Sequence, residues 1–124
     1  MEIDVSFAKI VINGKTYFKD IILCSDGKVL KRLKDLSKPL RDIYKHTPLS
    51  KKELEETIKI IGKVDLLIIG NGLEGKMPIQ EEALEYLNEI GLKYTVKKTK
   101  EACEIFNELL NKGVKVVAAL HLTC

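Results

Sequence analysis

The strongest indication of fold in this sequence is the segment Val64-Asp65-Leu66-Leu67-Ile68-Ile69-Gly70-Asn71-Gly72-Leu73-Glu74-Gly75. Its first six residues form a nearly continuous apolar run, which is typical of a strand that is buried on both faces. The three glycines that follow indicate a turn in which the backbone adopts positive φ angles or approaches another segment closely. We therefore expect residues 64–69 to form a central strand of a sheet.

Three helices are predicted, one before this strand in the sequence and two after it. The letters S-K-K-E at residues 50–53 have the pattern of a capping box and open a helix that ends at Gly62. A second helix follows Pro78 and stops at Gly91. A third helix, which we expect Thr99 to cap, runs to Gly113.

Further strands are expected between and after these helices, over residues 92–96 and 114–122. The alternation of helices and strands favours parallel strands with right-handed connections. The first third differs, because the pairs Asn13-Gly14 and Asp26-Gly27 separate apolar runs and predict hairpin turns. The strands flanking these turns are expected at residues 5–12, 16–18, 20–24 and 28–32.

These elements predict one layered α/β domain over residues 1–124, with a mixed central sheet, N-terminal β-hairpins and three helices. Residues 64–69 and 114–120 should be its central strands, since both are apolar on both faces. Residues 33–49 contain two prolines and little periodicity, so we expect them to form a long loop.

Composition limits the classes of function. No apolar run approaches the ~18 residues that span a bilayer, and Met1-Glu2-Ile3-Asp4 lacks the basic start of a signal peptide, so we expect a cytoplasmic protein without a membrane span. Three cysteines without a C-x-x-C pair argue against a disulfide framework and a zinc site. The 19 lysines against 2 arginines resemble hyperthermophile composition, although AT-rich coding bias gives the same pattern.

Nucleic acid is not expected as a partner. The net charge is only +3, and arginine, the usual reader of bases and phosphates, is rare. The lysines at positions 93, 97, 98 and 100 have no interleaved aromatic residues on which bases could stack.

The glycine-rich segment formally matches G-x-G-x-x-G, the dinucleotide-binding fingerprint. In that fingerprint the helix opens within the motif, whereas here Pro78 places the helix start beyond the last glycine. The acidic residue expected after the next strand is replaced by Lys97-Lys98. We therefore favour a structural turn and assign no cofactor, while exposed amides in the loop could still hold a small anion.

His121 is the only histidine on a predicted core element. A histidine near the end of a buried strand is more often a hydrogen-bonded structural residue than a catalyst, but strand ends in open α/β sheets also line the usual ligand crevice. Cys124 lies close to His121 in sequence, yet a terminal thiol lacks an evident orienting group. We assign no catalytic residue and no metal ligand.

The second half of the sequence contains two distinctive strings, I-G-x-G-x-x-G-x-M at residues 69–77 and V-A-A-L-H-L-T-C at residues 117–124. Between them lie Glu82, Leu87, Gly91, Thr99, Ala102, Phe106, Asn107, Leu110 and Gly113. In these residues the sequence resembles the uncharacterised Mth-type domain family, which includes the adipogenesis-associated Mth domain protein and the mitochondrial complex I assembly factor three. The resemblance covers residues 64–124 closely. Asn71 replaces a usual threonine and Phe106 a usual tyrosine. The resemblance implies a compact α/β domain without established enzymatic activity, in some relatives a helper of assembly.

We therefore expect a non-catalytic binding or assembly-type module with protein partners. The alternative is a small-molecule or anion binder, or an enzyme, that uses the carboxyl ends of parallel strands. In that arrangement the residues expected to surround one crevice are Gly70, Asn71, Gly72, Thr99 and His121. The prediction depends on the direction of the last strand, because a reversed strand would carry His121 to the opposite edge.

Overall fold

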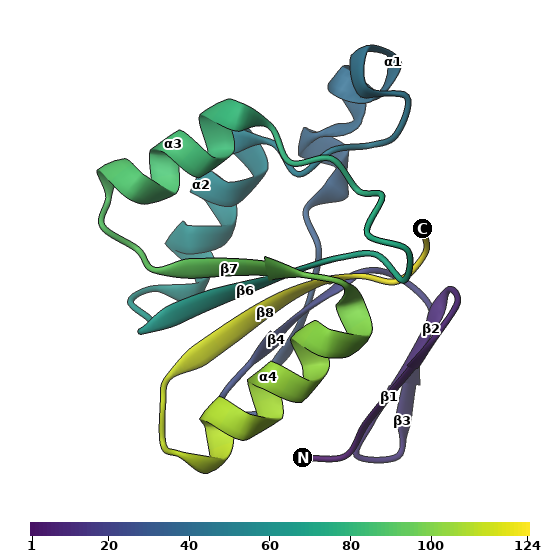
Figure 1. Ribbon diagram of the computed structural model, residues 1–124, viewed down its shortest axis with the longest axis vertical. Coiled ribbons are helices and arrows are strands. Elements are labelled where there is room, and N and C mark those ends of the chain that lie inside the picture. The colour runs from purple at the N-terminus through teal and green to yellow at the C-terminus, as the bar shows by residue number, and fades with distance from the viewer.

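The predicted central strand lies inside a five-stranded sheet of the computed structural model, which describes residues 1–124 (Figure 1). The strand order is β5-β4-β8-β6-β7. Strands β6 (Leu66–Asn71), β7 (Tyr94–Lys97) and β8 (Val116–His121) are parallel, whereas β4 (Ile21–Cys24) runs antiparallel to both β8 and β5 (Val29–Lys31). The expected mixed sheet, with β6 and β8 as inner strands, is confirmed.

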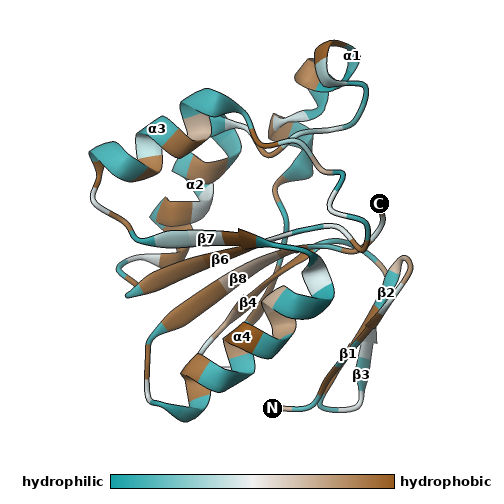
Figure 2. Ribbon diagram, viewed as in Figure 1, coloured by the Kyte–Doolittle hydropathy of each residue, from teal (hydrophilic) through white to brown (hydrophobic).

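Helices cover both faces of this sheet. Helices α2 (Lys51–Ile61) and α3 (Glu81–Glu89) pack on one face, and α4 (Thr99–Asn111) lies across the other (Figure 1). Successive residues of a strand point to opposite faces, so Ile68 packs in the α4 core while Ile69 packs in the α2–α3 core. The apolar colour of most of β6 and β8 in Figure 2 reflects this double burial. No helix is long and apolar enough to span a bilayer.

The first three strands form a second, antiparallel sheet of their own. Strands β1 (Ile3–Ser6), β2 (Lys9–Ile12) and β3 (Lys15–Tyr17) pack their apolar side chains against the α4 face of the central sheet. The expected single strand over residues 5–12 is wrong, because a turn at Phe7–Ala8 divides it. Ala8 adopts a φ of 60° there without any glycine or asparagine to indicate a turn.

The remaining expectations for local structure hold in part. Both predicted hairpin turns form, with φ angles of 49° at Asn13, 84° at Gly14 and 90° at Gly27. The long loop expected over residues 33–49 is instead largely helical, with η1 (Lys34–Leu36), η2 (Lys38–Leu40) and the short α1 (Arg41–Tyr44). Ser37 anchors this segment through buried hydrogen bonds to α2, and such a contact leaves no periodicity in the sequence.

Candidate functional site

The candidate site lies at the edge of the sheet where β6, β7 and β8 end. Parallel pairing places the ends of these three strands side by side, with Gly70 opposite both Lys97 and Leu120. Because β4 is antiparallel to β8, its first residue pairs with Leu120 at this same edge. The residue before it, Asp20, therefore lies beside His121, and the antiparallel β5 brings Arg32 next to Asp20.

The structure brings Gly70, Gly72, Thr99 and His121 together. The Thr99 hydroxyl accepts a hydrogen bond from the Gly72 amide at 2.9 Å and donates one to the His121 main-chain oxygen at 2.6 Å. A methyl group at Gly70 would lie 3.1 Å from the same hydroxyl oxygen. Thr99 is the first residue of α4 rather than its N-cap, so the expected capping role is wrong. Its hydroxyl ties strand ends together instead.

The amides of the glycine-rich turn already have acceptors within the chain. The Leu73 amide donates to the main-chain oxygen of Thr123 at 2.7 Å, and the Glu74 and Lys76 amides donate to that of Cys124 at 3.0 and 2.9 Å. Residues 123–124 thus occupy the crevice in which a small anion was expected. The main-chain oxygen of Asn71 accepts the Met77 amide, and its side-chain oxygen is buried without a donor. The ligand-binding role of Gly70, Asn71, Gly72, Thr99 and His121 stays a prediction.

The geometry of the turn supports its structural interpretation. Gly72 and Gly75 have φ angles of 108° and 72°, which L side chains rarely adopt. Gly70 has an ordinary φ and is needed because Leu120 and Thr99 approach it closely. The next helix begins only at Glu81, so the turn does not open a helix as a dinucleotide fingerprint does.

The imidazole of His121 lies between a carboxylate and a hydroxyl. Its Nδ1 is 2.7 Å from Asp20 Oδ2, and its Nε2 is 3.1 Å from Thr123 Oγ1. The side chain is 11% exposed. Asp20 also accepts hydrogen bonds from Arg32 Nη1 and from the Leu122 amide, both at 2.8 Å. The contacts at this sheet edge therefore join four groups, which are the side chains of Asp20, His121 and Arg32 and the amide of Leu122.

Arg32 extends this arrangement into a buried ionic network. Its Nε lies 2.8 Å from Glu53 Oε2, and its Nη2 donates to the Pro48 main-chain oxygen at 2.9 Å. Arg32 and Glu53 are only 4% and 1% exposed. Ser37 donates to Glu53 at 2.6 Å, which secures the short helices of residues 34–44. The Ser50 hydroxyl accepts the Glu53 amide, so the predicted helix cap forms, but the glutamate side chain pairs with Arg32.

Pairing within the network keeps Asp20 ionised. Burial raises the pKa of Asp20, but the hydrogen bond and charge of His121, the Leu122 amide and Arg32 together outweigh burial and lower the pKa to about 2. For Arg32 burial acts in the opposite direction and lowers the pKa, but the hydrogen bonds and charges of Glu53 and Asp20 raise it above its ordinary value. Asp20 and Arg32 are therefore both charged at neutral pH.

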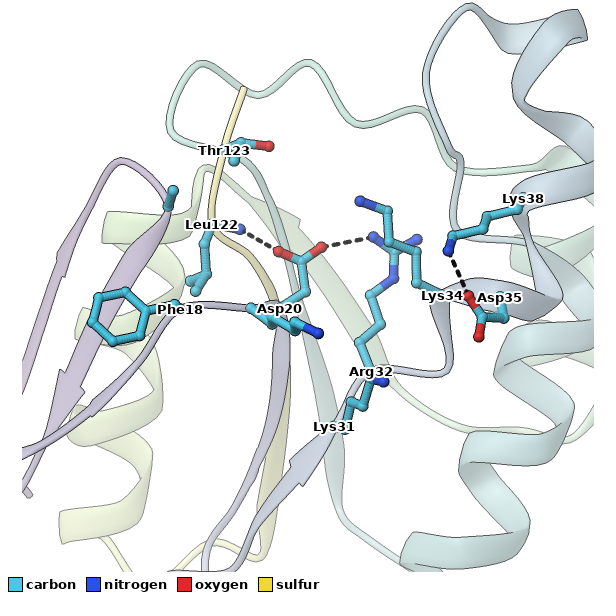
Figure 3. A pocket seen from close by; sticks show the side chains of 11 residues that line it. Phe18, Asp20, Lys31, Arg32, Lys34, Asp35, Lys38, Leu122 and Thr123 are labelled. Carbon is cyan, nitrogen blue, oxygen red and sulfur yellow. Dashed lines mark hydrogen bonds and ion pairs between the residues drawn. The ribbon is translucent and has the colours of Figure 1, made fainter.

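A cavity of about 300 Å³ opens beside this network (Figure 3). Five of its lining residues are basic and two, Asp20 and Asp35, are acidic; the basic ones are Lys19, Lys31, Arg32, Lys34 and Lys38. Arg32 pairs with Asp20, and Lys38 pairs with Asp35 at 2.7 Å, as the dashed lines in Figure 3 show. The other three lysines have no acidic partner within 4.0 Å. Leu122 and Thr123 complete the wall on the β8 side.

Sequence reasoning missed most of these cavity residues. Asp20 and Arg32 lie at the ends of predicted hairpin strands, where charged residues are usually exposed. The one available indication was that Arg32 is one of only two arginines in a lysine-rich chain, since arginine is preferred in buried ion pairs. No group of three or more His, Cys, Asp or Glu side chains is arranged to hold a metal ion.

The fold recurs in proteins of similar sequence. The family described as "Protein of unknown function (DUF498/DUF598)" matches residues 3–121. The chain belongs to the DUF498/DUF598 family. Two solved structures similar to this DUF498/DUF598 chain are a conserved hypothetical protein from Pyrococcus horikoshii OT3 and the protein MT938. The first is 28% identical, with all of both chains covered and a TM-score of 0.83. The second is 30% identical over 98% of this chain and 96% of that chain, with a TM-score of 0.75.

A third structure shows how far the fold of the DUF498/DUF598 domain extends. A protein from Bordetella parapertussis is 19% identical over 97% of this chain and 95% of its own, with a TM-score of 0.72. At this identity the likeness concerns the fold alone. The predicted α/β domain, with its mixed sheet, is thus found in chains whose sequences have largely diverged.

Proposed function

We propose that this DUF498/DUF598 protein is a binding module for a small anionic ligand, which is held in the cavity beside Asp20 and Arg32. The observation that carries the proposal is that Lys19, Lys31 and Lys34 line this cavity without an acidic partner. Ammonium groups that converge on a concave surface concentrate anions there and donate hydrogen bonds to carboxylate or phosphate oxygens.

The two acidic residues of the cavity wall do not cancel this attraction. Asp20 is held by Arg32, His121 and the Leu122 amide, and Asp35 is paired with Lys38. The positive charge that remains belongs to the three unpaired lysines. A volume of about 300 Å³ is at the small end of ligand pockets and suits a ligand with few heavy atoms.

The five residues expected at the glycine-rich crevice have a supporting role in this proposal. Gly70, Asn71, Gly72, Thr99 and His121 do not line the cavity, but their contacts fix the segment that carries Leu122 and Thr123 into its wall. We propose that they position this wall. The anion expected near the turn binds instead in the cavity, against Lys19, Lys31 and Lys34.

An assembly-type module is the second candidate, as the Mth-type resemblance implies. Two aromatic side chains favour it: Phe7 in the β1–β2 turn is 63% exposed, and Phe18 at the cavity is 71% exposed. Exposed aromatic residues are enriched where proteins dock. Capture of partners by wild-type protein and by a Phe7→Ser/Phe18→Ser variant, followed by mass spectrometry, tests this candidate. A cytoplasmic location and a thermophilic source stay predictions from composition.

Isothermal titration calorimetry with inorganic phosphate and with succinate tests the proposed binding function. Saturable binding of either anion, weakened by added salt, supports the proposal because screening acts on charge pairs at an open site. Heats no larger than those of dilution for both anions at low ionic strength would overturn it.

A further inference from the structure

We infer that Thr123, His121 and Asp20 form an acyl-transfer triad that cleaves an ester or thioester carrying an anionic group. The inference rests on the proposed function, because the cavity lysines would hold the anionic part of this substrate. The three side chains form one line of contacts: Thr123 Oγ1 to His121 Nε2 at 3.1 Å, and His121 Nδ1 to Asp20 Oδ2 at 2.7 Å. A hydroxyl, an imidazole and a carboxylate in this order are the parts of an activated nucleophile.

The carboxylate selects the useful form of the imidazole. Asp20 is fixed from two other sides by Arg32 and the Leu122 amide, so it does not depend on His121 for its place. An ionised Asp20 accepts a hydrogen bond and requires the proton of a neutral imidazole to reside on Nδ1. The lone pair of Nε2 then faces the Thr123 hydroxyl, as a general base requires.

The nucleophile also has access to a substrate. Thr123 and Asp20 both line the cavity, while the imidazole between them is largely shielded from solvent. The Thr123 hydroxyl has His121 as its only protein partner. The unpaired lysines of the same cavity provide positive charge for the substrate's carboxylate or phosphate and for the oxyanion that develops on its carbonyl oxygen.

The reaction needs only water as co-substrate. Thr123 Oγ1 attacks the carbonyl carbon, its proton moves to His121 Nε2, and a tetrahedral oxyanion forms. Its collapse breaks the bond from the carbonyl carbon to the leaving oxygen or sulfur, which takes the proton from His121. A water then attacks the acyl-Thr123 ester, gives a proton to His121, and releases the acid while the proton returns to Thr123 Oγ1.

The same contacts would be present if Thr123 merely held the imidazole in place, so the test needs a chemical readout. The probe is 4-nitrophenyl hydrogen adipate, an activated ester whose carboxylate is too far along the chain to attack its own ester efficiently, and 4-nitrophenyl hexanoate is its neutral counterpart. The variants are Thr123→Val, which removes the hydroxyl, and Thr123→Ser, which keeps it. Thr95→Val, a half-buried threonine on β7 outside the cavity, is the matched control.

We expect the wild type, Thr123→Ser and Thr95→Val to hydrolyse the adipate ester above its spontaneous rate, and faster than the hexanoate ester. Thr123→Val should lose this rate by roughly a hundredfold or more. Mass spectrometry of the quenched wild-type reaction should find an adipoyl group on Thr123. Melting curves verify that each variant is folded. Hydrolysis of the adipate ester by Thr123→Val at the wild-type rate, or acylation confined to lysines, would overturn the triad.

Succinate binding separates this inference from the function on which it rests. If the wild type and Thr123→Val bind succinate alike and neither hydrolyses the ester, the triad is refuted and the anion site stands. If the wild type does not bind succinate or phosphate, the proposed function itself is refuted.

Discussion

The hydroxyl of Thr99 lies 2.6 Å from the main-chain oxygen of His121 and joins the start of α4 to the end of β8. The same hydroxyl is the acceptor for the buried amide of Gly72. Replacing Thr99 with Val keeps the shape but leaves this amide and the His121 oxygen without a partner. We expect Thr99→Val to lower the free energy of unfolding by about 1–3 kcal/mol in urea denaturation.

Thr95→Val provides the control for this loss. Thr95 is half-buried on β7, its hydroxyl makes no side-chain hydrogen bond within the protein, and valine is well tolerated in strands. Its effect should stay within about 0.5 kcal/mol. Equal stability of Thr99→Val and Thr95→Val would show that the Thr99 hydroxyl does not tie the strand ends.

Gly72 should be the least replaceable glycine of the turn. It has a φ of 108°, and an added methyl group would overlap the main chain of Cys124. We expect Gly72→Ala to cost about 2–3 kcal/mol of unfolding free energy, because strain and the displacement of residues 123–124 combine. Gly70→Ala, which meets Leu120 and Thr99 at 3.0–3.2 Å in an ordinary conformation, should cost about 1 kcal/mol.

A substitution at Gly113 measures how much unfolding free energy a positive φ costs when the added methyl group meets no other atom. This glycine has a φ of 77° but open space where a methyl group would point. Gly113→Ala should therefore lose only about 1 kcal/mol in the same denaturation experiment. If Gly72→Ala melts like Gly113→Ala, the close approach of Cys124 does not constrain the turn.

Asp20 should make stability depend on pH in the acid range. Its pKa falls from the usual 3.8 to about 2 on folding, so its stabilising contribution is complete above pH 3.8 and is lost as pH falls through about 2. The difference corresponds to about 2 kcal/mol. We expect the stability gap between wild type and Asp20→Asn to narrow by this amount between pH 5 and pH 2.

An NMR titration of the Asp20 carboxyl carbon measures the same quantity directly. A midpoint close to pH 2 agrees with an ionised carboxylate held by Arg32 and His121. A midpoint near 3.8, together with a pH-independent gap between wild type and Asp20→Asn, would contradict this description of the network.

The sequence predicted the elements whose determinants are local. The apolar run over residues 64–69 indicates a strand buried on both faces whatever its neighbours are, and Asn13-Gly14 needs only its own φ angles to form a turn. The alternation of helices and strands favoured parallel strands in general, but it left open the direction of the last strand, and the structure shows that this strand is parallel and brings Gly70 and His121 to one edge.

The parts that escaped prediction depend on residues far apart in the chain. Asp20 and His121 are 101 positions apart, and Arg32 and Glu53 are 21 apart, so no local pattern relates them. Glu53 has the ordinary appearance of a capping-box residue in the sequence. The glycine pattern indicated available amides, but it could not indicate that residues 123–124 would be their acceptors.

Arg32 and Glu53 should be strongly coupled. Removing one partner leaves a buried charge without its counter-ion, so we expect Arg32→Leu and Glu53→Leu each to cost about 3–5 kcal/mol of unfolding free energy. The double variant should lose less unfolding free energy than the sum of the two single losses, by about 0.5–3 kcal/mol. Additive losses in this double-mutant cycle would contradict direct coupling.

The exposed pair Glu56–Lys59 on the same helix serves as the comparison for that cycle. Its atoms are 2.7 Å apart, as close as those of the buried pair, but both side chains reach solvent. Exposed ion pairs contribute little because water screens them. We therefore expect Glu56→Ala to leave the urea midpoint nearly unchanged.

The central claim, that the unpaired lysines hold an anion, is tested most directly by calorimetric titration of inorganic phosphate into two variants of equal charge. One is Lys19→Gln/Lys31→Gln/Lys34→Gln, which empties the cavity wall of unpaired cations. The other is Lys52→Gln/Lys63→Gln/Lys112→Gln, which removes three exposed lysines that also lack acidic partners and lie outside the cavity. We predict that the second variant binds phosphate like the wild type and that the first binds at least about tenfold more weakly. Equal phosphate affinity of the two variants would contradict the claim.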